Sequence, residues 1–263
     1  MSSSVRFTKM SGAGNDFIVI DARHMQETRA SAFAARVCRR RLELGADGLL
    51  LVSPAATNEV HVRYWNADGS DAAFCGNGAR CAARFAVHEG LTSSELLLHF
   101  CGTHRAWVGS DEVTVEVEEP HIFADRIDIE IDGTLFKGTM VDAGVDHLVF
   151  FTEGTPAPRL SCLARAVFAA HPRFEGQVNL SLARFVDAKT IALRTFERGS
   201  GETLACGSAA IAAGFLLART RGEQRVRILP PSQQVLFVQV EPPGRRVLLS
   251  GEARIVASGE IPA

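Results

Sequence analysis

The sequence lacks an excess of charge of either sign, a long apolar run and an apolar leader. Of its 263 residues, 28 are Lys or Arg and 30 are Asp or Glu, a formal net charge of −2. A protein that binds nucleic acids or acidic membranes usually has a positive electrostatic field of its own, so this charge balance predicts neither as a partner. No apolar run approaches the ~18–20 residues that span a bilayer, and the opening MSSSVRFTK has no apolar stretch of the secretory kind. We therefore expect a cytoplasmic protein.

Motifs that hold a metal or a cofactor are also missing. No CxxC pair occurs, and the nearest ligand-like spacing is Cys101 to His104. There is no P-loop, and residues 12–14 (GAG) and 76–78 (GNG) lack the third glycine of a dinucleotide fingerprint. Only three lysines are present, none in a Schiff-base context. The sequence predicts a protein without cofactor or metal, and its 46% hydrophobic content is ordinary for a folded chain.

The two halves of the chain resemble each other. Counted back from Cys75 and from Cys206, an Arg stands at −12, an aromatic residue at −10 and an acidic residue at −4. Residues 14–20 and 144–150 repeat at nearly the offset of 131 that separates the two cysteines. Several matches in one order predict an internal duplication. We expect two similar domains that face each other, residues 1–118 with a C-terminal strand at 255–263, and residues 119–254.

The periodicity of the sequence predicts the secondary structure of each unit. Residues 59–65 and 112–118 alternate apolar and polar side chains, as half-buried strands do. Residues 79–87 and 209–217 are rich in Ala, and the second stretch is apolar on every face, which is typical of a buried helix. The prediction is an α/β fold of two pseudo-symmetric domains, each a curved, mainly antiparallel sheet wrapped on a central helix. Cys75 and Cys206 then stand at or just before the helix N-termini.

A thiol at a helix N-terminus can act as an acid or a base. The unpaired N–H groups there favour an anion and lower a thiol pKa, and the neighbouring glycines let amides approach a carboxylate. Inverting a carbon centre needs a base on one face and an acid on the other, which a facing thiolate and thiol supply. The alternative is that the cysteines are buried small hydrophobes, the ordinary role of all six. They are Cys38, Cys75, Cys81, Cys101, Cys162 and Cys206.

Five longer motifs make the sequence resemble the diaminopimelate epimerase family over nearly its whole length. They are residues 9–17 (KMSGAGNDF), 45–50 (GADGLL), 66–70 (NADGS), 75–81 (CGNGARC) and 197–207 (ERGSGETLACG). The resemblance implies two pseudo-symmetric α/β domains that close over a small amino-acid substrate, without cofactor or metal. It further implies an isomerase of lysine biosynthesis and allows a homodimer.

The resemblance also assigns roles to residues. It makes Cys75 and Cys206 the acid and base thiols, and His147 and Glu197 groups that tune them. The substrate contacts that it implies are Asn15, Asn66, Asn179, Glu197 and Arg198 at the unreactive end, and the turns Gly76–Asn77 and Gly207–Ser208 at the reacting carboxylate. Without the motifs, Asn beside Gly is ordinarily a turn residue, and an adjacent Glu and Arg a solvated pair.

Two departures from the family pattern bear on the substrate, beside a milder one at Ala209, where glycine is frequent in the family. Val145 stands where the family commonly has Asn or another residue, and Asp146 where it has Pro. Val145 cannot replace the hydrogen bonds of an Asn, and Asp146 adds a negative charge near a site for a dicarboxylate. The sequence therefore leaves two alternatives beside diaminopimelate epimerase: a racemase of the same fold for another free amino acid such as histidine, and a non-catalytic binding protein.

Overall fold

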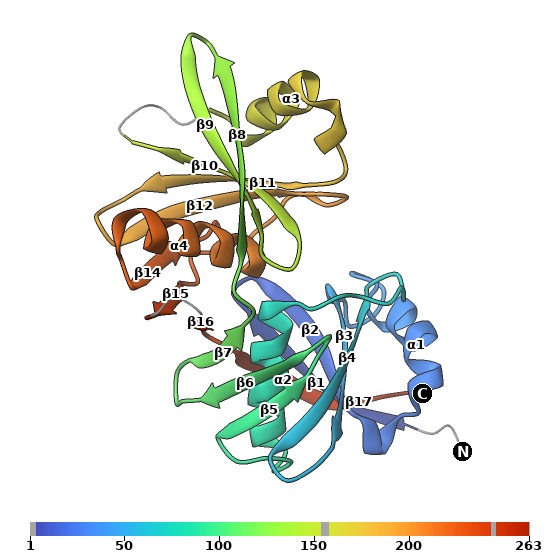
Figure 1. Cartoon of the computed structure of the whole chain (residues 1–263). Helices are drawn as coiled ribbons and strands as arrows, with labels where there is room; N and C mark the ends of the chain where they lie inside the picture. The colour runs from blue at the N-terminus through green and yellow to red at the C-terminus, as the bar shows by residue number, and fades with distance from the viewer. Residues whose placement is uncertain (1–3, 154–157, 243–245, 263) are drawn as a thin grey trace. The chain divides into compact units, whose positions relative to one another are not determined.

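The computed structural model describes residues 4–153, 158–242 and 246–262, which form two compact units (Figure 1). Unit 1 contains Met1–Glu116 and Ser250–Ala263, and unit 2 contains Val117–Leu249. Unit 1 thus includes the five residues before the predicted strand at 255–263, and Ser250 Oγ lies 2.8 Å from Thr114 Oγ1 of the same unit. In the described part of the chain, no helix has the length and apolarity needed to cross a membrane.

Unit 1 is a mainly antiparallel sheet in which two neighbouring pairs of strands are parallel. Its strands pair in the order β17-β1-β2-β3-β4-β5-β6-β7, with β2–β3 and β4–β5 parallel. Their bounds are β1 (Ser4–Gly12), β2 (Asn15–Asp21), β3 (Gly48–Pro54), β4 (Glu59–Asn66), β5 (Glu95–His99), β6 (Thr103–Val108), β7 (Val113–Val117) and β17 (Arg254–Pro262). The helices are α1 (Ala30–Val37), α2 (Gly76–His88) and the 3-10 turns η1 (Ala22–His24) and η2 (Glu27–Arg29).

Unit 2 repeats this pairing pattern. Its strands pair in the order β8-β9-β10-β11-β12-β14-β15, again with two parallel pairs, β10–β11 and β12–β14. The bounds are β8 (His121–Ile131), β9 (Thr134–Asp142), β10 (Asp146–Thr152), β11 (Asn179–Phe185), β12 (Thr190–Glu197), β13 (Gly201–Glu202), β14 (Arg225–Leu229), β15 (Leu236–Glu241) and β16 (Arg246–Gly251), with helices α3 (Leu160–Ala170), α4 (Gly207–Arg221) and η3 (Pro172–Phe174). The matching patterns agree with a duplication of the chain.

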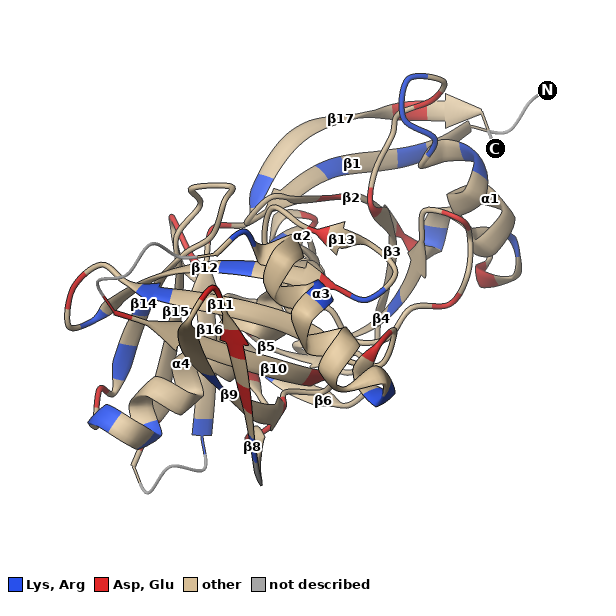
Figure 2. Ribbon diagram, turned by 90° about the horizontal axis from the view of Figure 1, so that it is seen from above, with Lys and Arg blue, Asp and Glu red and all other residues tan. Residues whose placement is uncertain are grey.

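The second helix of each unit packs against several strands of its own sheet. In unit 1, α2 contacts every strand from β1 to β6 and also β17 (Figure 1). In unit 2, α4 contacts β10, β11, β14 and β15, and its buried residues include ten of its fifteen positions. A helix buried on nearly every face must be apolar all round, as predicted from residues 209–217. Figure 2 shows α4 uncharged until its last turn, which carries Arg219 and Arg221.

A first, outer helix covers the other face of each sheet. In unit 1, Phe33 and Val37 of α1 pack with Ile18 and Leu49 of the strands. In unit 2, the equivalent cluster joins α3 to the strands through Leu160, Leu163, Phe150 and Leu180. Each sheet therefore buries both faces against helices. The predicted fold class is confirmed, with mixed and mostly antiparallel sheets.

Candidate functional site

Cys75 is the N-cap residue of α2. Its backbone is extended (φ −129°, ψ 114°), and Sγ accepts a hydrogen bond from the Gly78 amide at 3.4 Å. The thiol is half-buried. Sulfur thus takes the place that a Ser, Asp or Asn oxygen has at most helix starts, where it faces unpaired amides. The geometry favours a negative charge on this sulfur.

Cys206 occupies the equivalent position in unit 2. It is the N-cap of α4 with nearly the same backbone angles (φ −132°, ψ 118°), and its side chain is buried. Sγ lies 3.3 Å from Ser208 Oγ. The sequence placed each cysteine at or just before a helix N-terminus, and the structure locates both at the cap itself.

The environment of Cys206 keeps the thiol protonated. Burial is the main cause that raises its pKa well above the ordinary range, and the negative charge of Glu197 raises it further. The Ser208 hydroxyl and the Ala209 amide act in the opposite direction and do not compensate. The expectation that the helix start lowers the pKa is therefore wrong for Cys206, because desolvation of the thiolate outweighs the amides.

His147 reaches the same group from β10. Its side chain is fully buried, and Nε2 lies 2.9 Å from Ser208 Oγ. Burial, assisted by the positive charge of Arg198, lowers the pKa of His147 to about 3, so the ring is neutral at physiological pH. Nδ1 has no hydrogen-bond partner. A line of contacts thus runs from the imidazole through the Ser208 hydroxyl to the Cys206 thiol.

The other predicted residues of unit 2 form a second group. Asn179, at the start of β11, accepts the backbone N–H of Arg198 at 3.0 Å. Arg198 Nη1 donates to the Gln177 carbonyl at 3.4 Å, and Glu197 accepts a hydrogen bond from Thr203 Oγ1. These contacts fix the turn after β12 that carries Glu197 beside Cys206. Glu197 is half-buried, whereas Arg198 is exposed apart from its contact with the Gln177 carbonyl.

In unit 1, a chain of side-chain amides lies behind Cys75. Asn15 Nδ2 donates to Asp47 Oδ2 at 3.0 Å, and Asn15 Oδ1 accepts from Asn77 Nδ2 at 2.7 Å. Asn77 Oδ1 in turn accepts from Arg80 Nη2 at 2.7 Å. The four side chains run from a carboxylate to a guanidinium, and each amide uses both its oxygen and its nitrogen. We name this series Asp47–Asn15–Asn77–Arg80 the amide chain.

A charged cluster supports the Asp47 end of the amide chain. Arg40 bridges Asp16 and Asp47, with Nη2 at 2.5 Å and 2.7 Å from their carboxylates. Lys9 Nζ lies 2.6 Å from Asp16. Burial alone would raise the pKa of Asp16, but Arg40 and Lys9 together lower it, so this carboxylate stays charged. The cluster orients Asn15 through Asp47.

Asn66 is not part of the amide chain. It ends β4, where its Nδ2 donates to Ser70 Oγ at 3.0 Å and its backbone N–H bonds to the Ser70 carbonyl at 2.9 Å. This is the turn role that Asn beside Gly ordinarily has. Asn66 pairs with Gly48 in the sheet, and in the repeat its equivalent position in unit 2 is Glu197.

The sequence reasoning missed two residues, Asp47 and Arg80. Asp47 lies in the quoted motif at residues 45–50 and received no role, because its partner Asn15 is 32 positions away. Arg80 follows Asn77 by one helical turn, a spacing that brings side chains together. A helix that begins at Gly76 places Asn77 and Arg80 on the same face, and this spacing was the signal for the pair. Within the described ranges, no group of three or more His, Cys, Asp or Glu is arranged to hold a metal ion.

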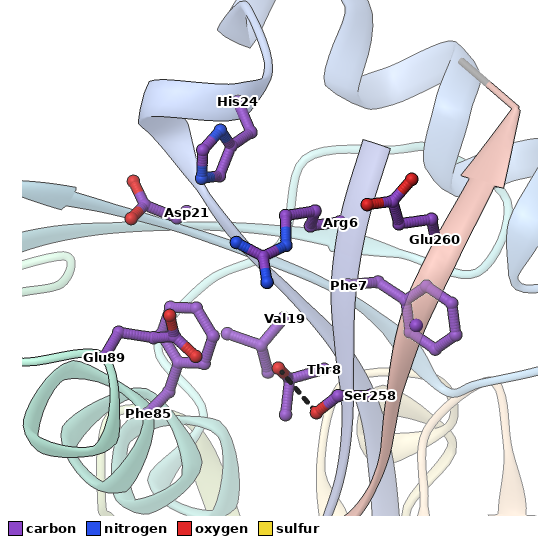
Figure 3. Close-up of a pocket in the computed structure, with 11 residues that line it drawn as sticks. Arg6, Phe7, Thr8, Val19, Asp21, His24, Phe85, Glu89, Ser258 and Glu260 are labelled. Atoms are coloured by element: carbon purple, nitrogen blue, oxygen red, sulfur yellow. Dashed lines mark hydrogen bonds between the residues drawn. The ribbon is translucent and has the colours of Figure 1, made fainter. Parts of the chain in front are cut away.

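A separate cavity of about 310 Å³ opens on unit 1 (Figure 3). It lies between β1, β2, β17 and the end of α2, with Arg6, His24 and Glu89 around it. None of the predicted site residues lines it. Acidic and basic side chains are mixed around this cavity, so its lining favours neither an anionic nor a cationic ligand.

The fold and the cysteine-capped helices define the class: duplicated α/β proteins with a central helix in each unit. Solved structures share this fold over nearly the whole chain. A PhzF-family phenazine biosynthesis protein from Bacillus anthracis has 13% sequence identity and a TM-score of 0.70, with 98% of this chain and 99% of that chain covered. A hydroxyproline epimerase from Agrobacterium vitis, solved with trans-4-hydroxy-L-proline, has 11% identity and a TM-score of 0.70, with 98% and 92% covered.

Sequence comparisons narrow this class to one family. The sequence model of diaminopimelate epimerase matches residues 7–121 and 139–256. The diaminopimelate epimerase of Aromatoleum aromaticum is 36% identical over 275 residues, covering 98% of this chain and 99% of its own. That of Moorella thermoacetica is 32% identical over 280 residues, with 98% and 99% covered. The chain belongs to the diaminopimelate epimerase family, a family of isomerases, which confirms the resemblance seen in the motifs.

Proposed function

We propose that this protein interconverts LL- and meso-diaminopimelate in lysine and cell-wall precursor biosynthesis, with Cys75 and Cys206 as acid and base and without a cofactor. The observation that carries the proposal is the placement of each thiol at the N-cap of a central helix, within motifs of the family. The relatives named above carry the substrate assignment. The proposal includes the cytoplasm as the site of action and a homodimer as the assembly.

The chemistry requires two opposite proton transfers at one carbon. One cysteine, as thiolate, takes the α proton, and the electron pair of the broken C–H bond stays on the carbon. The other cysteine, as thiol, gives its proton to the opposite face. The product has inverted configuration, and the two cysteines have exchanged protonation states. Cys206, whose pKa burial raises, is suited to rest as the thiol.

The backbone amides at each helix start bind the substrate carboxylate at the reacting carbon. They thereby stabilise the negative charge that develops on that carbon and spreads into the carboxylate. Residues 76–77 and 207–208 supply backbone N–H groups in the first turns of α2 and α4, where no intrahelical acceptor is available. Asn15, Asn66, Asn179, Glu197 and Arg198 are assigned to the distant end of the substrate.

Val145 favours a second candidate function, a racemase for another free amino acid such as histidine. In the repeat, Val145 is the equivalent of Asn15, whose amide bonds to both Asp47 and Asn77. Val145 offers no such hydrogen bonds. Asp146 begins β10 and pairs with Asp142 across the β9–β10 hairpin, so it serves as a strand-start residue.

Deuterium incorporation tests both candidates. Reduced protein in D₂O is given LL-diaminopimelate or one of a panel of free L-amino acids, and mass spectrometry follows the label while chiral chromatography follows inversion. The proposal requires label and inversion in diaminopimelate. Label confined to histidine or another monocarboxylate would reassign the substrate. If no compound were labelled, the alternative of a non-catalytic binding protein would remain.

Single replacements then test the two-thiol mechanism. Cys75→Ala and Cys206→Ala should each abolish inversion, because each face of the carbon needs its own thiol. Cys162→Ala, in the outer helix α3, is the control and should keep wild-type turnover. Inversion at a near-normal rate in either of the first two variants would refute the mechanism.

A further inference from the structure

Arg80 is a fully buried cation in the first turns of α2. Its side chain is 0% exposed. Nη2 donates to Asn77 Oδ1 at 2.7 Å and Nη1 to the Gly76 carbonyl at 3.3 Å, while Nε has no hydrogen-bond partner. Burying a guanidinium without an anion costs several kcal/mol. A chain that keeps this residue buried therefore needs a negative charge close to it.

That negative charge is not a carboxylate. In the part of the chain that the structure describes, no Asp or Glu forms an ion pair with Arg80. Burial lowers the pKa of Arg80 to about 10, and negative charge on the neighbouring thiols of Cys81 and Cys75 acts in the opposite direction. Burial raises the pKa of Cys81 to about 12, so Cys81 is a neutral thiol near pH 7. Cys75 is the remaining group that can carry the charge.

Other charged groups on the elements around α2 have partners or are exposed. On β1 and β2, Lys9 and Asp16 pair with each other. On β6, His104 contacts two backbone carbonyls, and on α2 itself Arg84 donates to the Gly109 carbonyl. Strand β3 has no titratable side chain, and those of β4, β5 and β17 are exposed or paired, as in Glu59–His99. Arg80 is thus the buried cation of α2, and its Nη1 contact with the Gly76 carbonyl joins it to the residue that follows Cys75.

Unit 2 has the opposite arrangement. The fifth residue of α4, equivalent to Arg80 in α2, is Ile211, which is buried and apolar. The charged neighbour of Cys206 is the carboxylate of Glu197. One thiol therefore lies near a buried cation and the other near an anion, although the backbone at the two caps is nearly the same.

We propose that Arg80 is the buried counter-cation of the Cys75 thiolate and holds the first turn of α2 in its catalytic geometry. This inference rests on the proposed function, in which Cys75 is one of two acid–base thiols. Arg80 is a positioning residue, since it acts through Cys75, the Gly76 carbonyl and Asn77. The asymmetry makes Cys75 the resting thiolate and Cys206 the resting thiol.

Alkylation of Cys75 without substrate measures this effect separately from turnover. Reduced protein is treated with iodoacetamide between about pH 5 and 10, and peptide mass spectrometry follows Cys75 and Cys206 individually. The variants are Arg80→Gln, which keeps an amide donor but loses the charge, and Arg80→Lys, which keeps the charge. Arg84→Gln, four residues further along the same helix, is the matched control. Circular dichroism and urea unfolding establish that each variant is folded.

The wild-type Cys75 should alkylate with a pKa below the ordinary thiol value of about 8.5. Arg80→Gln should raise that pKa by about one or more, so that alkylation near pH 7 slows about tenfold or more. Arg80→Lys should restore most of the rate, and Arg84→Gln should not change it. The alkylation of Cys206 should be the same in all folded variants.

An unchanged Cys75 pKa in folded Arg80→Gln would overturn the inference. If Arg80→Gln does not fold, the wild-type comparison decides, because a Cys75 pKa at or above that of Cys206 also refutes it. A low Cys75 pKa that depends on Arg80, found in a protein that labels no amino acid in D₂O, would sustain the inference while refuting the proposed function.

Discussion

Ser208 connects a buried imidazole to a buried thiol, so removing its hydroxyl tests how unit 2 controls Cys206. Ser208 Oγ lies 2.9 Å from His147 Nε2 and 3.3 Å from Cys206 Sγ. Ser208→Ala removes both contacts and keeps the backbone N–H assigned to the substrate carboxylate. The perturbation is therefore confined to one oxygen atom.

The effect on stability follows from the burial of His147. The ring is 0% exposed, and its Nδ1 already has no partner. Ser208→Ala leaves Nε2 without a partner as well, which should lower the free energy of unfolding by about 1–3 kcal/mol. Because the pKa of His147 is lowered to about 3, the ring is neutral in both proteins and the loss should be the same from about pH 5 to 8.

The effect on catalysis follows from the charge that develops on Cys206. The Ser208 hydroxyl lowers the pKa of this thiol against the effect of burial. A hydrogen bond to a charged group contributes about 1.5–3 kcal/mol, so kcat should fall about 10- to 100-fold. KM should change little because the backbone amide remains. Ser208→Thr, which keeps a hydroxyl, is the matched control.

The assay is the rate of inversion of diaminopimelate measured by chiral chromatography, together with urea unfolding. A folded Ser208→Ala variant with kcat within about twofold of wild type would refute the role of the hydroxyl. A large rise in KM with unchanged kcat would instead assign the side chain to substrate binding.

Three further predictions concern charge, packing and the remote end of the substrate. Burial raises the pKa values of Cys38 and Cys81 to about 12, so the folded protein binds these protons more tightly than the unfolded chain. The free energy of unfolding should therefore keep its full value below the ordinary thiol pKa of about 8.5 and fall above it by about 1.4 kcal/mol per pH unit for each thiol. Urea titrations in reductant that show no loss of stability at alkaline pH would contradict this. Gly214→Ala should destabilise the protein by about 1–3 kcal/mol despite the better helix propensity of Ala, because the new Cβ would lie 2.6 Å from Val238 Cβ; higher stability in urea would show that α4 can move. Arg198→Ala should weaken binding of a substrate with a second carboxylate by about tenfold or more and spare a monocarboxylate, measured as KM; equal losses would remove Arg198 from the remote end.

Local patterns made much of the fold predictable. The matches between residues around Cys75 and Cys206 indicated a duplication, and the two units have the same order of strand pairing. The all-apolar stretch at 209–217 identified the core of α4, and the Cys–Gly pairs marked the starts of both helices. These features depend on periodicity and capping, which act over a few residues.

The Ala-rich stretches at 79–87 and 209–217 cover only part of each helix. The helices begin three and two residues earlier, at Gly76 and Gly207, directly after the cysteines. Gly76 and Gly207 are poor helix formers inside a helix, but at the first position the amide has no intrahelical bond to lose. Similarly, Ser250 joins unit 1 through its contact with Thr114, and no local pattern marks that residue.

The sequence by itself determined the duplication, the cysteine-capped helices and the family. Only the tertiary structure decided how the two thiols differ. Arg80 and Ile211 hold equivalent helix positions, and the resemblance that made Glu197 a tuning group did not give the direction in which burial and Glu197 shift the pKa of Cys206. The pKa of a thiol depends on desolvation and on charges brought from distant segments. Those distances exist only once the sheet has folded around its helix.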